Sequence, residues 1–268
     1  MTHRHLYAIE RHGDALNLTC PYLVEVIQAE PGIDNRNVLP WSRLFLIDPD
    51  GPAAADEVTD VVLRRRYTLH PGGVLLMPPD RLYAFRFHPG MRMLAAHFRL
   101  EWAPGCDVFS GRSGCAVIPG QADLIRRAYA ALAAGEDLKA AATLRGTLML
   151  LAGPCIGPLR PLPARLRSVL DRIEADCRAD LAVGELAAVA GLSRERFSRV
   201  FSETIGVPPM EHVHRRLTAR ACALLLDGLL VQEVSEQLRF SSPFWFSRFF
   251  RNRMGVPPRD FRLLLSRG

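Results

Sequence analysis

The sequence FSETIGVPP at residues 201–209 has a second copy, FRNRMGVPP at residues 250–258, which is identical to it at five of nine positions. The identity extends upstream at the same offset of 49 residues, where Phe-Ser-Arg occurs at 197–199 and again at 246–248. A solenoid needs about three or more repeats to bury its faces, and this chain has two. The pattern therefore predicts one small module that occurs twice.

Each copy has the pattern of a helix-turn-helix. In the first copy, a short apolar helix is followed by Gly191, which supplies the tight turn, and by Ser193, which can cap the next helix. In the second copy, Ser242 is the expected N-cap and Pro243 suits the first helical position. Between the copies, residues 210–228 predict a helix of roughly 25 Å, at 1.5 Å per residue. Such a rod could place two recognition helices in successive major-groove segments, about 34 Å apart.

The positive charge is confined to the half of the chain that carries the duplication. Residues 160–268 contain 18 arginines and 12 acidic residues, which equals the whole net charge of +6, and residues 1–159 are neutral. A basic half joined to a neutral half indicates a polyanion-binding domain attached to another domain. A solvated arginine-rich surface would give the same count, so charge alone leaves both readings open.

The first half predicts a mainly β domain followed by two helices. Short β-type runs such as WSRLFLI and LYAFRF lie between residues 41 and 118, separated by Asp, Gly and Pro turns, which favours a small barrel. Residues 123–152 predict two Ala/Leu-rich helices broken near Gly135. Six Gly or Pro in residues 153–163 then mark a linker.

Several classes of function find no support in the sequence. There is no P-loop, GxGxxG, GxSxG or HExxH motif, so we expect no enzyme activity and no cofactor. The first 18 residues lack a signal-peptide core, and no apolar run reaches about 18 residues, so a cytoplasmic protein is expected. The six cysteines show no CxxC and are expected to be reduced core thiols, with a redox pair at Cys106 and Cys115 as the alternative.

The two copies, ELAAVAGLSRERFSRVFSETIGVPP and VQEVSEQLRFSSPFWFSRFFRNRMGVPPRDFR, resemble the paired helix-turn-helix domain of the AraC/XylS family of bacterial transcription regulators. The first half resembles that family's cupin-like effector domain through LHPGGVLLMPPDRLYAF and MLAAHFRL. The resemblance implies a cupin-like effector-binding and dimerisation domain at 1–152, a linker at 153–163, and an all-α domain of two helix-turn-helix units joined by a linker helix at 164–268. It also implies a regulator that acts on double-stranded promoter DNA, with RNA polymerase as a further partner. The apolar helices expected at 123–152 need a partner surface, so they either pack on their own domain or form a homodimer, and the homodimer is the hypothesis that we carry forward.

Carried over by position, the resemblance assigns both recognition helices. It implies that these side chains contact base edges or phosphates: Arg194, Glu195, Ser198, Arg199, Pro243, Phe244, Trp245, Ser247 and Arg248. Arg215, Arg216 and Arg251 are expected to contact phosphate, which positions a protein without reading sequence. The four phenylalanines at 197, 201, 246 and 250 are expected in the core.

The chain departs from the family pattern at two positions of the second copy. Arg239 stands where the family has glycine in the turn, and an arginine is a poor residue for positive φ, so a reshaped turn is expected. Ser235 replaces a small apolar residue, Ala187 in the first copy.

For the first domain, the resemblance implies a small-molecule pocket inside the barrel. Its lining residues would be Trp41, Arg43, Tyr83, Phe85 and His97. Two alternatives stay open: aromatic residues on alternating strand positions can be plain core, and the domain can serve dimerisation or protein interaction without an effector. A metal-dependent cupin enzyme is the third reading, although the barrel histidines do not form an HxH pair.

Overall fold

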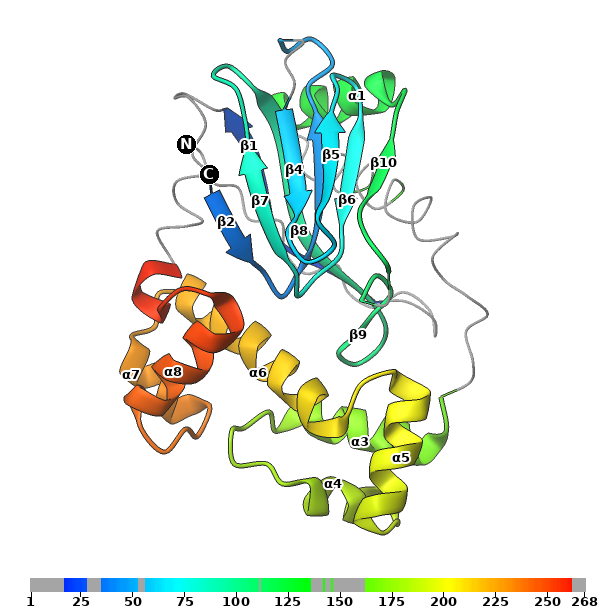
Figure 1. Cartoon of the computed structure of the whole chain (residues 1–268), viewed down its shortest axis with the longest axis vertical. Coiled ribbons are helices and arrows are strands. Elements are labelled where there is room, and N and C mark those ends of the chain that lie inside the picture. Colours follow the sequence, from blue (N-terminus) through cyan, green and yellow to red (C-terminus); the bar gives the residue numbers. More distant parts are fainter. Residues whose placement is uncertain are drawn as a thin grey trace. The chain divides into compact units, whose positions relative to one another are not determined.

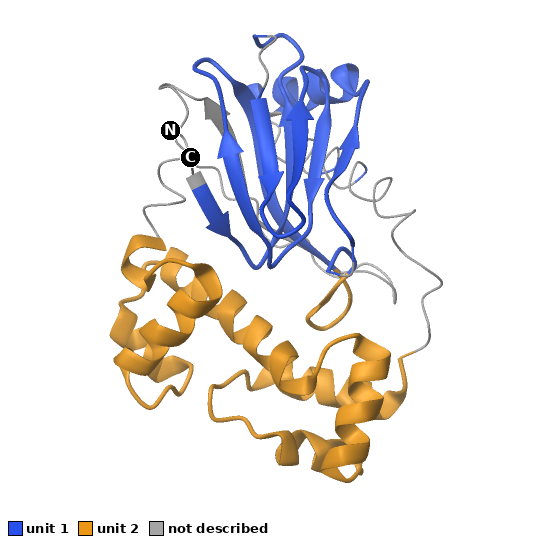
Figure 2. Ribbon diagram, viewed as in Figure 1, with its two compact units in different colours: residues 1–100, 108–158, 268 blue, residues 101–107, 159–267 orange. Residues whose placement is uncertain are grey.

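The computed structural model describes residues 17–27, 35–52, 56–110, 112–135 and 162–261, with the single residues 142 and 146. The chain forms two compact units, which have different colours in Figure 2. One comprises residues 1–100 with 108–158, and the other comprises residues 101–107 with 159–267. The predicted second helix after Gly135 and most of the predicted linker at 153–163 lie outside the described residues.

The strands of the N-terminal unit form two antiparallel sheets (Figure 1), except that residues 101–107, which include the end of β8 and the whole of β9, group with the other unit. One sheet has the order β1-β8-β3-β6-β10, with β9 paired to β8, and the other has the order β2-β7-β4-β5. The bounds of the first sheet are β1 Asn17–Ile27, β8 Arg92–Ala103, β3 Ser42–Ile47, β6 Val74–Met77, β10 Ala116–Ile118 and β9 Cys106–Asp107. Those of the second are β2 Asn35–Val38, β7 Leu82–Arg86, β4 Asp56–Asp60 and β5 Arg65–Leu69.

Alternating side chains of β3 serve two different cores, because successive residues of a strand point to opposite faces. Leu44 and Leu46 pack in a cluster with Ile125 and Ala128 of helix α1 (Ala122–Ala133). On the other face, Phe45 and Ile47 pack in a cluster with side chains of both sheets. The predicted β domain and its first following helix are confirmed, and Gly135 has the positive φ of 73° that ends a helix.

The C-terminal unit is all helical. Its helices are α3 Ala164–Ala175, α4 Val183–Ala190, α5 Arg194–Ile205, α6 Pro209–Leu226, α7 Val231–Gln237 and α8 Pro243–Met254. Figure 1 shows α3, α4 and α5 at one end of α6, with α7 and α8 at its other end. The predicted arrangement of two helix-turn-helix units joined by a linker helix is confirmed. None of the helices that the structure describes is both long and apolar enough to span a bilayer.

The two units use the same local chemistry. The side chain of Ser193 accepts a hydrogen bond from the Arg196 backbone N–H, and that of Ser242 accepts one from the Trp245 backbone N–H, each at 3.3 Å. These bonds satisfy donors that a helix N-terminus leaves free. Both predicted N-caps are therefore confirmed. The four predicted core phenylalanines are fully buried, at 197, 201, 246 and 250.

The turn of the second unit keeps positive φ without glycine. Gly191 ends α4 with φ of 65°, and Arg239 follows α7 with φ of 54°. Three residues separate α4 from α5, whereas five separate α7 from α8. The second turn is thus longer than the first, and the arginine itself adopts the left-handed conformation. Ser235, the other departure, is buried at 1% exposure.

Candidate nucleic-acid interface

The first recognition helix, α5, places its predicted contacts on the side opposite its core residues. Phe197 and Phe201 are buried because they lie on the side of α5 that packs against α4 and α6. The centres of their rings are 5.5 Å apart. Arg194, Glu195 and Arg199 are exposed, and Ser198 is half-buried. The guanidinium of Arg194 lies against α4, since a Cβ at Gly184 would come within 2.8 Å of its Nε and Nη2. The predicted contacts that α5 presents to solvent are therefore two arginines and one carboxylate, with the Ser198 side chain partly accessible beside them.

The second recognition helix, α8, presents an aromatic surface at its N-terminal end. Phe244 is 68% exposed and Trp245 is 50% exposed, and their rings meet edge to face at 5.7 Å. The guanidinium carbon of Arg248 lies 5.3 Å from the centre of the Trp245 ring. Pro243 is also exposed, and Ser247 is half-buried. Exposed large apolar side chains gathered at one place mark a surface that meets a partner.

Charge pairing divides the arginines of this unit into two groups. Arg178 is bonded to Asp176, Asp180 and Glu185, and Arg253 is bonded to both oxygens of Glu211. Among the residues that the structure describes in this unit, ten exposed arginines form no ion pair. Five of them lie on α5 or α8: Arg194, Arg196, Arg199, Arg248 and Arg251. Each recognition helix therefore presents unpaired positive charge to solvent.

Arg215 and Arg216, which were predicted to contact phosphate, are engaged within the protein. Nε of Arg215 lies 3.1 Å from Glu211 Oε1. Arg216 is bonded to Glu174, and its Nη1 lies 2.8 Å from Oε1 of Glu101. All three residues belong to the same compact unit, and the Arg216 side chain is 13% exposed. These bonds would have to open before either side chain met a phosphate. The phosphate role of Arg215 and Arg216 stays a prediction, and the exposed Arg251 fits it better.

In the N-terminal unit, the five residues predicted to line an effector pocket do come together. Arg43 of β3 is paired in register with His97 of β8, and its guanidinium carbon lies 5.1 Å from the Tyr83 ring and 5.4 Å from the Phe85 ring. Trp41 lies parallel to the His97 ring with centroids 6.4 Å apart. All five are buried. Their role in binding stays a prediction.

Burial sets the protonation states of His97 and of two cysteines. It lowers the pKa of His97 to about 3, with a further contribution from the charge of Arg43, so the imidazole is neutral at pH 7. Burial likewise raises the pKa of Cys106 to about 12 and that of Cys115 to about 11, so both remain thiols. Thiols held protonated in this way are poor nucleophiles, which disfavours the redox pair considered above.

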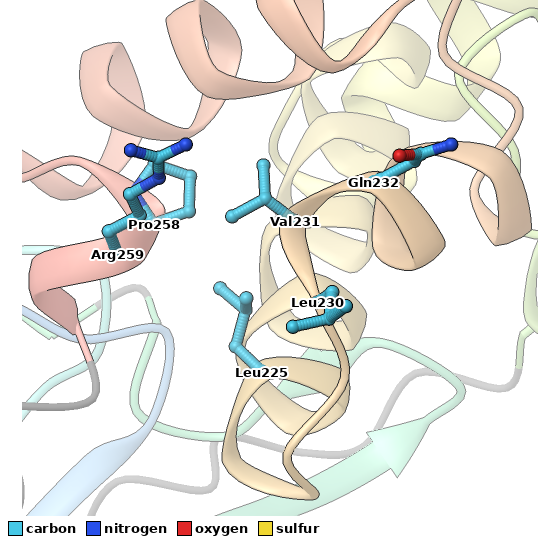
Figure 3. A pocket seen from close by; sticks show the side chains of 6 residues that line it. All are labelled: Leu225, Leu230, Val231, Gln232, Pro258 and Arg259. Atoms are coloured by element: carbon cyan, nitrogen blue, oxygen red, sulfur yellow. The ribbon is translucent and has the colours of Figure 1, made fainter.

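Within the described ranges, no group of three or more His, Cys, Asp or Glu side chains is arranged to hold a metal ion. A hollow of about 370 Å³ is lined by residues of α6, α7 and the segment after α8 (Figure 3): Leu225, Leu230, Val231, Gln232, Pro258 and Arg259. None of the residues predicted to contact DNA or an effector lines it.

The geometry defines a double helix-turn-helix domain with two cationic recognition helices. A family model described as a helix-turn-helix domain matches residues 186–263. The putative HTH-type transcriptional regulator YkgA of Escherichia coli is 29% identical over 98 residues, which cover 36% of this chain and 41% of YkgA. The HTH-type transcriptional activator AarP of Providencia stuartii is 26% identical over 99 residues, 37% of this chain and 73% of AarP. The C-terminal unit is therefore an AraC-type helix-turn-helix domain, and the resemblance seen in the sequence is confirmed.

The whole chain resembles a solved structure in fold. The crystal structure of ToxT from Vibrio cholerae O395 has a TM-score of 0.58 and 13% identity, over 95% of this chain and 99% of that one. A second ToxT structure, described as bound to an unsaturated fatty acid, has a TM-score of 0.56 and 11% identity, over 96% and 98% of the two chains. At such identity the likeness shows the shared fold, a β-rich domain followed by a helical one. The curated relative YkgA, in contrast, is matched over less than half of its length.

Proposed function

We propose that this chain is a sequence-specific DNA-binding transcription regulator. The observation that carries the proposal is the set of five exposed arginines without ion pairs on α5 and α8, Arg194, Arg196, Arg199, Arg248 and Arg251. Phosphate groups attract such charge, and neutralising them releases counterions, which supplies affinity. The relatives YkgA and AarP, described as a regulator and an activator, support the same reading.

In this proposal the two recognition helices read base edges in the major groove. Arg199 and Arg248 each have the fork that fits O6 and N7 of guanine, and Glu195 can accept from N4 of cytosine. The exposed Phe244 and Trp245 rings suit the thymine methyl group. Arg251 contacts phosphate and positions α8 without reading sequence.

The N-terminal unit, in the same proposal, binds a small-molecule effector and forms a homodimer, in a cytoplasmic protein that acts with RNA polymerase. The gathering of Trp41, Arg43, Tyr83, Phe85 and His97 supports the effector role, and ToxT, which shares the fold, has been described with a bound fatty acid. A unit that serves dimerisation or protein interaction alone is the second candidate. Sedimentation at micromolar concentration tests the dimer.

The experiment that tests DNA binding uses the full chain. Target sequences are selected from fragmented genomic DNA, and Kd is then measured for the best target and for single-base variants of it. Arg199→Ala and Arg248→Ala should each lose about 10- to 100-fold in affinity for the target and relax the preference at one base position. Arg251→Ala should weaken binding to all sequences and reduce the salt slope by about 1.

The matched control is Arg126→Ala, which removes the same charge from α1, outside the helix-turn-helix domain. It should leave both affinity and base preference unchanged. Equal losses for all four variants on every sequence would refute the assignment of base-reading roles. Failure of the wild-type chain to select any sequence would refute the proposed function itself.

A further inference from the structure

Arg43 carries a buried charge that the described part of the chain does not neutralise. The residue is 1% exposed and belongs to β3, where its side chain lies on the same face as Phe45 and Ile47, between the two sheets. Burial lowers the pKa of Arg43 to about 10, which leaves the guanidinium charged at pH 7. A cation removed from water in this way is unfavourable unless it is paired with an anion.

The groups around Arg43 are neutral. The side chains that act on it electrostatically are Tyr83 and Cys115, whose pKa values are both raised by burial, so neither is ionised at pH 7. The facing His97 is neutral as well. Asp60, the carboxylate that acts on Tyr83 and Cys115, is bonded to Arg81 at 3.2 Å. Among the residues described, the pairing that a buried guanidinium requires is therefore missing.

The donors of Arg43 show where an anion would bind. Nη1 donates to Oδ1 of Asn37 at 2.7 Å, while the buried Nε and Nη2 have no hydrogen-bond partner among the described residues. Nε–H and Nη2–H lie along the same edge of the planar guanidinium and form the fork that donates to both oxygens of one carboxylate. The two open donors are thus the pair that binds a carboxylate in bidentate geometry.

The rings beside this fork indicate what else the ligand carries. The guanidinium lies against the Tyr83 and Phe85 rings, and Trp41 packs on the neighbouring His97. These side chains offer apolar surface and one neutral imidazole, and no second cation. An inorganic phosphate with two charges would be poorly matched here, because one guanidinium cannot offset both.

We infer that the N-terminal unit binds a small organic monocarboxylate, held by a bidentate bond to Nε and Nη2 of Arg43 and packed by its apolar part on Tyr83 and Phe85. The inference rests on the proposed effector role of this unit and specifies its chemical class. The carboxylate supplies the missing counter-charge, and the aromatic side chains exclude water from the ion pair, which strengthens it.

The test measures the thermal unfolding and the calorimetric binding of the full chain with matched ligands. Benzoate and hexanoate at millimolar concentration should raise Tm by about 2 °C or more, since they bind only the native state. Their neutral counterparts benzamide and hexanamide, and inorganic phosphate, should leave Tm unchanged. This comparison within the wild-type chain does not depend on any variant folding.

Variants of Arg43 then test whether this residue binds the carboxylate. Arg43→Met should weaken benzoate binding about 100-fold, and Arg43→Lys, which keeps the charge but loses the fork, about 10-fold. The matched control is Arg126→Met, a surface arginine paired with Asp50 and Asp123, which should bind benzoate like the wild type.

The inference is overturned if no carboxylate stabilises the chain, if the amides or phosphate stabilise it equally, or if Arg43→Met binds benzoate as tightly as Arg126→Met. DNA binding is measured on the same preparations. A chain that selects a DNA target but ignores every carboxylate refutes this inference and leaves the proposed regulator intact. A chain that is stabilised by carboxylates but selects no DNA target refutes the proposed regulator and leaves the carboxylate site intact.

Discussion

Replacing Arg239 by glycine should stabilise the C-terminal unit. The residue is exposed and has φ of 54°, in the left-handed region where a Cβ costs about 1–2 kcal/mol. Glycine removes that strain but adds about 0.5–1 kcal/mol of chain entropy to the unfolded state. The net gain expected for Arg239→Gly is thus about 0.5–1 kcal/mol, equivalent to about 3–5 °C in Tm for a unit of this size.

Two control variants separate the cost of positive φ from the loss of the arginine side chain. Arg239→Ala removes the same long side chain but keeps the Cβ, so its Tm should match the wild type within about 1 °C. Gly191→Ala introduces the opposite change at φ of 65° in the first turn, where a Cβ meets no atom within 4 Å, so its expected loss of about 1 kcal/mol comes from φ alone.

Scanning calorimetry of the full chain measures all three variants. The transition that Gly191→Ala lowers is assigned to the C-terminal unit, and Arg239→Gly should raise that same transition. If Arg239→Gly has no effect, or if Arg239→Ala raises Tm equally, the gain does not come from φ and the reasoning is wrong.

Three further outcomes follow from the described contacts. Trp245→Ala should change stability by less than about 0.5 kcal/mol, because the ring is half exposed, yet lower DNA affinity at least about 10-fold in the titrations described above; a large stability loss would place the ring in the core instead. Phe250→Ala should destabilise the C-terminal unit by about 3–5 kcal/mol in urea unfolding, since the ring is fully buried between Phe246 and Phe261, and a loss below about 1 kcal/mol would contradict that packing. His97 takes up its proton near pH 6.5 in the unfolded chain but only near pH 3 in the folded one, so the stability that it contributes is complete above pH 6.5 and falls as the pH drops. Between pH 7 and 5 the free energy of unfolding should fall by about 2 kcal/mol because of this residue, and His97→Gln should lack that part of the fall. An unchanged pH dependence in the variant would refute the burial of a neutral imidazole.

Features set by neighbouring residues could be predicted from the sequence. Ser193 and Ser242 cap their helices by a bond to a backbone N–H three residues ahead, and that rule needs no knowledge of the rest of the fold. The core phenylalanines follow from helical spacing in the same way. Strand β1 was not predicted, since Pro21 interrupts its pattern; proline is tolerated at a sheet edge, and β1 is the end strand of its sheet.

Features set by distant residues could not be predicted. Arg216 looks like an exposed cation in sequence, but its partners Glu174 and Glu101 lie 42 and 115 residues away along the chain. The unsatisfied donors of Arg43 are equally invisible, because they depend on which side chains of two sheets meet around it. The turn at Arg239 was expected to be reshaped, and what the sequence could not show is that the turn is longer and yet keeps a left-handed residue, which here is an arginine.

The two recognition helices are built alike but carry different side chains, Arg194 and Glu195 at the start of one, Phe244 and Trp245 at the start of the other. A single chain therefore has a front and a back along the double helix, unlike a symmetric dimer whose halves are interchangeable. If the chain binds DNA as proposed, the sequence read by one chain needs no palindrome, and reversing that sequence relative to a gene reverses the direction of its helix-turn-helix domain along the DNA.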